Sequence, residues 1–189
     1  MGGLNAVALR RRPDAPLLSQ RQMDWVFEFP EKSERQSTRS HEVCVFLAFA
    51  RDTPFRIYSF VGTAHNPGLL SQFHRKDDGV WMYSVTGGSG NDDWYLLPQA
   101  FAFQFEAYLA AMCIDPTKPL PPRPLFPQSN PAYGYSSDTI FQHLENYRKE
   151  LANAAQISAD EEIRDGFAKF SQLNSCMIRR SAKALRQDG

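Results

Sequence analysis

The sequence predicts an α+β fold: a mixed or antiparallel sheet of four to six strands, one helix packed on it, a proline-rich strap and a C-terminal pair of helices. Three observations lead to this prediction. Short apolar or alternating segments, separated by turn residues, occupy the first half of the chain and are typical of strands. One segment in the middle and two at the end have apolar residues at helical spacing. Between them, residues 116–131 contain seven prolines, which neither a helix nor a central strand accommodates.

We expect one domain, because 189 residues are enough to bury about two thirds of the surface of the unfolded chain. The C-terminal helices are expected to pack on the same domain as the sheet. In chain order, the parts are a basic N-terminal lead-in (1–18), an α+β core (19–115), the proline-rich strap (116–135) and the helical pair (136–189).

The segment 43–62 is predicted to be a central hairpin. Its first eight residues are all apolar, too few for a membrane span, and are typical of a strand buried on both faces. Its last eight residues alternate, as a second strand does. Between the two runs the chain is predicted to turn, because Pro54 disfavours helical backbone at Thr53.

Other strands are predicted on either side of this hairpin. Alternation indicates a first strand at 25–29, stopped by Pro30, and the polar run 31–41 is predicted to be a solvated loop.

A second hairpin is predicted around Asp78-Gly79, the dipeptide that favours a tight turn. It joins the segments 69–75 and 80–86, and a further short strand is predicted at 94–97.

Three helices are predicted after the strands. Pro98 suits the first position of a helix, and apolar residues recur at helical spacing after it. Ser136 or Ser137 is the expected N-cap of the second helix. Ser158 and Glu161 have the spacing of a capping box for the third.

Composition limits the classes of partner. The 21 basic and 21 acidic side chains cancel, so DNA would have to bind a local patch. Cys44, Cys113 and Cys176 lie far apart among apolar residues, and we expect them to be reduced and buried. No segment reads as a transmembrane helix. A cytoplasmic location is expected from reduced cysteines of this kind.

The densest polar cluster runs from His74 to Asp78. His74, Arg75 and Lys76 are candidates for binding a nucleotide or another phosphate group, because cations with several donors suit phosphate oxygens. Asp77 and Asp78 are candidate ligands of a divalent metal ion. The alternative is a hairpin tip whose charged residues are simply solvated.

Glu106 is the second candidate, and with Arg75 it is the predicted catalytic pair. It is the only charged residue between Asp93 and Asp115, within an otherwise apolar helix. A carboxylate near apolar surface has a raised pKa or a fixed partner, and both are useful in acid–base or metal chemistry. The alternative is a residue at the edge of the buried stripe that pairs with an arginine such as Arg56.

Several weaker signals have structural alternatives. The C-terminal cations could form a DNA or partner surface, or a solvated helix end; they are Arg179, Arg180, Lys183 and Arg186. His65-Asn66 suits a ligand-facing loop or an ordinary turn, and Gly87 to Gly90 suits a phosphate loop without the lysine that such a loop needs. Residues 118–124 have the spacing of a proline-rich ligand, although a rigid strap is the preferred interpretation.

Three stretches give the chain a resemblance to a known family. They are Arg10-Arg-Arg-Pro-Asp, Phe55-Arg-Ile-Tyr-Ser-Phe-Val-Gly and Tyr135-Ser-Ser-Asp-Thr-Ile-Phe-Gln-His-Leu. With the length and course of the whole chain, they resemble the plasmid fertility-inhibition factors with oncogenic suppression activity, in the ParB/sulfiredoxin superfamily. The superfamily's Gly-Cys-His-Arg or Gly-Glu-Arg-Arg signature is reduced here to the His-Arg pair of Phe73-His74-Arg75-Lys76, so sulfinic-acid reductase chemistry is not expected.

This resemblance implies a ParB/sulfiredoxin-like fold and a function. It implies an ATPase and metal-dependent DNase that uses ATP and Mg²⁺ and acts on DNA to block conjugative transfer through a type IV secretion system. Arg75 and Lys76 would hold phosphate, while Asp77, Asp78 or Glu106 would hold a metal ion or activate water. The alternative is a non-catalytic adaptor that binds the secretion coupling machinery through the strap or the basic C-terminal helix. A third alternative is a small ligand-binding domain.

Overall fold

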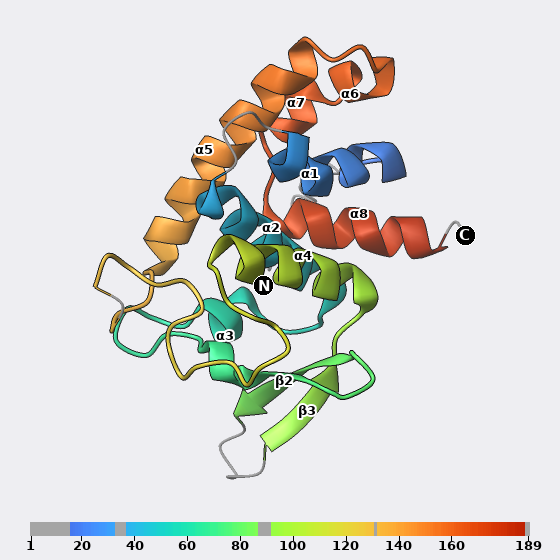
Figure 1. Cartoon of the computed structure of the whole chain (residues 1–189). Coiled ribbons are helices and arrows are strands. Elements are labelled where there is room, and N and C mark those ends of the chain that lie inside the picture. Colours follow the sequence, from blue (N-terminus) through green and yellow to red (C-terminus); the bar gives the residue numbers. More distant parts are fainter. Residues whose placement is uncertain (1–15, 33–36, 87–91, 131, 188–189) are drawn as a thin grey trace, which may run out of the picture.

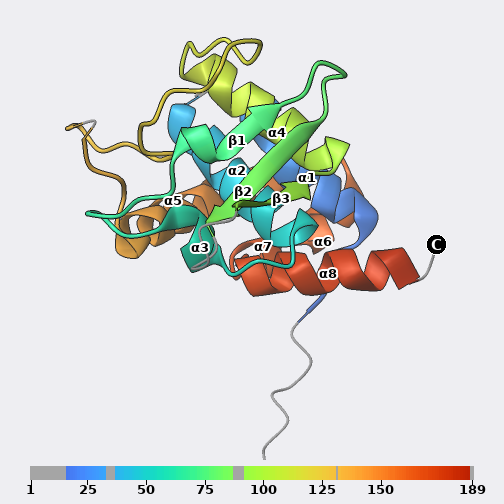
Figure 2. The ribbon, with the colours of Figure 1, turned by 90° about the horizontal axis from the view of Figure 1, so that it is seen from below.

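The computed structural model describes residues 16–32, 37–86, 92–130 and 132–187 of the chain. In these ranges the protein is α+β, with a helical layer on one side of a small antiparallel sheet (Figure 1; Figure 2). The helices are α1 (Gln20–Lys32), α2 (Thr38–Asp52), α3 (Ile57–Val61), α4 (Gln99–Ala111), α5 (Ser137–Gln156), α6 (Glu161–Asp165), α7 (Phe167–Phe170) and α8 (Ser175–Gln187). The strands are β1 (Phe73–Arg75), β2 (Trp81–Thr86) and β3 (Asp92–Leu96), after a 3₁₀ turn at Leu70–Gln72.

The predicted central hairpin is wrong, because the segment forms helix α2 followed by the short helix α3. A continuous apolar run fits a buried helix as well as a buried strand. Here the polar residues before the run complete the helix, and Ser37 caps it by accepting a hydrogen bond from the Ser40 N–H at 3.3 Å. The predicted turn is confirmed, since α2 ends at Asp52 and Thr53 before Pro54 has extended backbone.

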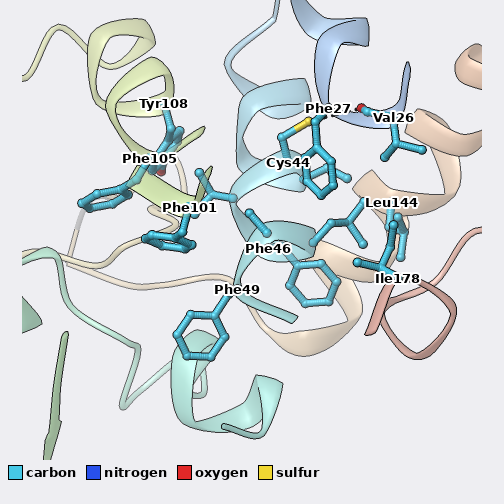
Figure 3. Close-up of a cluster of buried hydrophobic side chains, with 14 of the residues drawn as sticks. Val26, Phe27, Cys44, Phe46, Phe49, Phe101, Phe105, Tyr108, Leu144 and Ile178 are labelled. Carbon is cyan, nitrogen blue, oxygen red and sulfur yellow. Dashed lines mark hydrogen bonds between the residues drawn. The ribbon is translucent and has the colours of Figure 1, made fainter. Parts of the chain in front are cut away.

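Helix α2 is the centre of the fold, and it is apolar all round because other helices surround it. Helices α1, α4, α5 and α8 all pack against it (Figure 1). Every residue from Val43 to Ala50 is buried. Figure 3 shows how Phe46 and Phe49 of α2 lie among side chains of α4, α5 and α8.

The strand predicted at 25–29 is also a helix, α1. Its buried side chains include Met23, Val26 and Phe27, which share one helical face although the local sequence also alternates. Ser19 and Gln22 form a reciprocal capping box, at 3.2 and 3.3 Å, that starts this helix. The predicted loop 31–41 is likewise shorter than expected, because α2 begins at Thr38.

The sheet has three strands in the order β1-β2-β3, all antiparallel, rather than four to six. The three segments that were predicted as strands and form α1, α2 and α3 account for the difference. The second hairpin is confirmed: β1 and β2 flank the turn, and Gly79 has a φ of +85° that favours glycine. The predicted strand near Trp94 is confirmed as β3.

Helix α4 forms as predicted after Pro98 and packs between α2 and the sheet. The ring centroids of Phe105 and Phe73 lie 4.4 Å apart, and those of Phe105 and Trp81 lie 5.0 Å apart. The proline-rich strap contains neither helix nor extended strand, as predicted, and is anchored by buried Leu125 and Phe126.

The C-terminal helical pair is only partly confirmed. Ser136 caps α5 by accepting from the Thr139 N–H at 3.3 Å, as expected. The second predicted helix is instead the three pieces α6, α7 and α8. Helix α6 is capped by Asp160 rather than by Ser158. Helix α8 begins after Asn174, whose side chain accepts a hydrogen bond from the Met177 N–H at 2.9 Å.

The cysteines differ from the prediction. Cys44 is buried (Figure 3). Its Sγ lies 3.4 Å from the Tyr147 hydroxyl, which donates to the carbonyl oxygen of Val26. Cys113 and Cys176 are exposed, because each lies at the end of a helix on its outer side. No helix in the described part of the chain is both long and apolar enough to cross a bilayer.

Candidate functional site

The β1–β2 hairpin holds the predicted cluster in a tight turn. Backbone hydrogen bonds of 2.9 Å close it, from the Lys76 N–H to the Val80 carbonyl and from the Gly79 N–H to the Lys76 carbonyl. One carboxylate oxygen of Asp78 stabilises this turn, because its Oδ1 accepts a hydrogen bond from the Val80 N–H at 3.0 Å. The turn therefore fixes where the side chains before it point.

The hairpin brings Arg75 and Glu106, the predicted catalytic pair, together. Arg75 lies opposite Trp81 in the register, and the two share the sheet face toward α4. The Arg75 Nε is 3.4 Å from the Glu106 Oε1, and the Trp81 indole N–H donates to the same oxygen at 2.9 Å. Because the Arg75 Nε–H is not aligned for a hydrogen bond, this contact is an ion pair. Both charged side chains are about one third exposed, 34% and 39%, and remain accessible to a ligand.

In the described part of the chain no helix covers the opposite face of the sheet (Figure 2). Aromatic side chains lie on this face. His74 and Trp94 meet there edge to face, with centroids 6.0 Å apart. Trp94 is 48% and Leu96 is 58% exposed. A cavity of about 230 Å³ at the edge of β1 is lined from both faces, by His74 and Trp94 from this one and by Arg75 from the other, together with Lys118 of the strap and further residues. The sequence analysis did not select Trp94 or Lys118, because their proximity depends on the strand register and on the course of the strap.

Lys76, Asp77 and Asp78 surround a separate, open hollow at the tip of the turn, together with His74. Among the described residues, no three His, Cys, Asp or Glu side chains gather as a ready-made metal site. Two adjacent carboxylates still suit Mg²⁺, which keeps several waters and is often shared with phosphate oxygens. Asp77 and Asp78 would be its protein ligands.

Two of the four C-terminal cations bind the end of α2. Arg179 donates from Nε to the Ala50 carbonyl at 2.9 Å and from Nη2 to the Phe55 carbonyl at 2.7 Å. Arg186 lies 3.4 Å from the Asp52 carboxylate. The other two cations, Arg180 and Lys183, are exposed on α8.

His65 and Asn66 lie in a turn, where the Asn66 N–H donates to the Thr63 hydroxyl at 3.0 Å. The predicted phosphate loop, Gly87 to Gly90, lies outside the described residues. Among the described residues, the candidates selected from the sequence therefore lie together around β1.

A second group of titratable side chains was not selected from the sequence. The Glu42 Oε2 on α2 lies 3.2 Å from the His143 Nδ1 on α5, and the Tyr135 hydroxyl lies 3.4 Å from the Glu42 Oε1. The Glu42 and His143 side chains are only 5% and 11% exposed. The rings of Tyr135 and His143 also meet edge to face, with centroids 5.0 Å apart.

Burial determines the protonation of this group. It raises the pKa of Glu42 to about 7, although the Tyr135 hydrogen bond and the charge of Arg39 act in the opposite direction. Burial and Arg39 both lower the pKa of His143. Burial, followed by the nearby Glu42, raises the pKa of Tyr135 to about 12. At neutral pH His143 is therefore uncharged.

The His143 ring lines a cavity of about 400 Å³ between the start of α2 and the middle of α5. The exposed Arg39 and Glu150 lie on its wall, with the Asn146 amide. A buried carboxylate next to a cavity is a frequent mark of a functional site. Helical spacing places His143 on the same face as the buried Ile140 and Tyr147, which is the sequence signal that could have drawn attention to it.

Comparison with protein-family models and with curated proteins finds no match for this chain.

Proposed function

We propose that this protein is a plasmid fertility-inhibition factor that blocks conjugative, type IV secretion-dependent DNA transfer through nucleotide-regulated DNase activity. The observation that best supports a DNA-directed function is the juxtaposition of Arg75, His74 and Lys118 with the exposed ring of Trp94 around one cavity. Cations next to an exposed aromatic ring are what a nucleic-acid strand needs, since the phosphates pair with the former and a base stacks on the latter.

Single-stranded DNA suits this surface better than duplex DNA. An unpaired base can lie flat on Trp94, whereas a paired base presents only its edges in a groove. The overall charge of zero also favours a local patch over the broad basic surface that duplex binding usually requires.

The catalytic part of the proposal uses the residues of the same hairpin. Arg75 would bind the phosphate, and Glu106, held by Trp81, would accept a proton or bind a metal ion. Asp77 and Asp78 would hold Mg²⁺, which neutralises phosphate charge when bound. ATP would contact His74, Arg75 and Lys76 through its phosphates.

A binding assay tests the DNA surface directly. Fluorescence anisotropy with a labelled single-stranded oligonucleotide should give weaker binding for Trp94→Ala by about tenfold or more, because stacking contributes about 1–3 kcal/mol per base. Phe141→Ala on α5 removes an aromatic ring of similar exposure, 44% against 48% for Trp94, outside this surface and should leave binding unchanged. Equal binding by the wild type and Trp94→Ala would contradict the proposed surface.

The adaptor remains a second candidate, favoured by the exposure of Pro119 and Pro122 on the strap and of Lys183 on α8. Removing residues 179–189 would be an ambiguous test, because Arg179 supports the end of α2. Lys183→Glu is a cleaner variant. Loss of transfer inhibition with unchanged DNA cleavage in this variant would favour the adaptor over the nuclease.

A further inference from the structure

His143 combines the three features of a general base. It lines a cavity large enough for a small ligand, its Nδ1 lies 3.2 Å from a carboxylate oxygen of Glu42, and it is uncharged at neutral pH. A carboxylate on Nδ1 fixes the imidazole ring and keeps the proton on that nitrogen, which leaves Nε2 free to accept one.

Glu42 is well placed to hold the ring rather than to react itself. Its side chain is 5% exposed and belongs to the rigid central helix, and Tyr135 holds its other oxygen. Replacing the carboxylate would leave the imidazole without its orienting partner, so Glu42 would act through His143.

We propose that the α2–α5 cavity is a second site, separate from the Arg75–Glu106 hairpin, at which His143 is the general base for hydrolysis of a small phosphodiester and Glu42 is its positioning residue. Arg39, the cation on the cavity wall, would bind a nonbridging phosphate oxygen. Glu150, also on the cavity wall, repels a second phosphate, which favours a small diester over a polynucleotide strand.

The reaction is balanced without a further reactant. A water molecule gives one proton to the His143 Nε2 while its oxygen forms a bond to phosphorus. The bond from phosphorus to the ester oxygen breaks, and the protonated imidazole returns the proton to that leaving oxygen. Each turnover consumes one water and leaves His143 neutral.

The pH dependence follows from the groups that face Glu42. These are Arg39 on α2, Tyr108 on α4, Tyr135 on the strap and His143 on α5. Only an ionised Glu42 accepts the Nδ1 proton and frees Nε2, so activity should rise as the pH increases through about 7. In Glu42→Gln the amide oxygen still accepts this proton, and the rise should move to a lower pH, set by His143 alone.

The experiment measures hydrolysis of bis(p-nitrophenyl) phosphate and of a labelled single-stranded oligonucleotide by the full chain, from pH 5 to 9. We expect His143→Gln to lower kcat about 10²-fold or more for the small diester while leaving oligonucleotide cleavage at the hairpin unchanged. Glu42→Gln should lower the small-diester activity less while shifting the acidic limb of its pH profile. His65→Gln, an exposed histidine in a turn, is the matched control and should keep wild-type activity. Free imidazole should restore activity to His143→Ala, which a purely structural histidine would not allow.

The outcomes separate the two proposals. Hydrolysis of the small diester that survives in His143→Gln, or an unshifted pH profile in Glu42→Gln, would overturn the role of this pair and leave the DNase proposal standing. No cleavage of either substrate by a folded wild-type protein would overturn both. Circular dichroism of each variant distinguishes loss of the base from loss of the fold.

Discussion

The guanidinium of Arg179 joins the last helix to the end of the central one, because it donates to the carbonyl oxygens of both Ala50 and Phe55, at 2.9 and 2.7 Å. The Ala50 carbonyl belongs to the final turn of α2, where helical partners run out and a cation is favourable, and the Phe55 carbonyl lies just after the helix. A residue predicted as part of a DNA surface thus has a structural role.

Arg179→Ala should therefore lower the free energy of unfolding by about 1.5–3 kcal/mol, the usual contribution of hydrogen bonds to a charged group. Urea denaturation followed by tryptophan fluorescence measures this. Lys183→Ala, from the exposed side of the same helix, is the control and should change stability by less than about 0.5 kcal/mol. Equal stabilities of the two variants would contradict the role of Arg179.

The aromatic cluster below α2 should be the most sensitive part of the core. Phe49 is fully buried and stacks on Phe60, with ring centroids 3.9 Å apart. Phe49→Ala should cost about 3–5 kcal/mol, through lost burial and the cavity that remains. Phe103→Ala on α4, where the side chain is 66% exposed, should cost much less in the same denaturation experiment.

Glu42 should make stability depend on pH with a definite sign. Its pKa is raised from 4.5 to about 7 on folding, so the folded protein holds the proton more tightly. Its stabilising contribution is full below pH 4.5 and is lost as the pH rises toward 7, by up to about 3 kcal/mol.

The lowered pKa of His143 has the opposite effect, because it makes the protein more stable as the pH rises to 6.5. Since His143 is present in both proteins, comparing the wild type with Glu42→Gln isolates the effect of the carboxylate. The wild type should lose stability relative to this variant between pH 5 and 8. Parallel stability curves for the two proteins would show that Glu42 ionises without cost in the folded state.

The three cysteines should react at different rates. Burial raises the pKa of Cys44 to about 12 and removes it from solvent, whereas Cys113 and Cys176 are exposed. Titration with Ellman's reagent at pH 8 should label two thiols quickly and the third only on addition of denaturant. Rapid labelling of all three in the folded protein would contradict the burial of Cys44.

The sequence predicted best those elements whose signals are local. The Asp78-Gly79 turn, the helix after Pro98 and the N-cap at Ser136 were all predicted from a few adjacent residues and are confirmed. The error at 43–50 has a different cause. A run that is apolar on every side carries no periodicity, and only the surrounding helices decide between strand and helix.

For the candidate site, individual residues could be predicted from the sequence but their contacts could not. Arg75 and Glu106 were selected separately from the sequence, but their contact depends on how the hairpin packs against α4. Glu42 and His143 could not have been paired from the sequence. Glu42 lies between the predicted loop 31–41 and the strand predicted from residue 43, and only the helix that forms there places it against α5.

The proposed function depends most directly on one measurement: cleavage of labelled single-stranded DNA by the purified protein, with Mg²⁺ and with and without ATP. The account predicts cleavage that responds to ATP, falls at least tenfold in Arg75→Ala and is unchanged in Arg148→Ala. DNA that stays intact under all these conditions with a folded wild-type protein, or equal cleavage by Arg75→Ala, would contradict it.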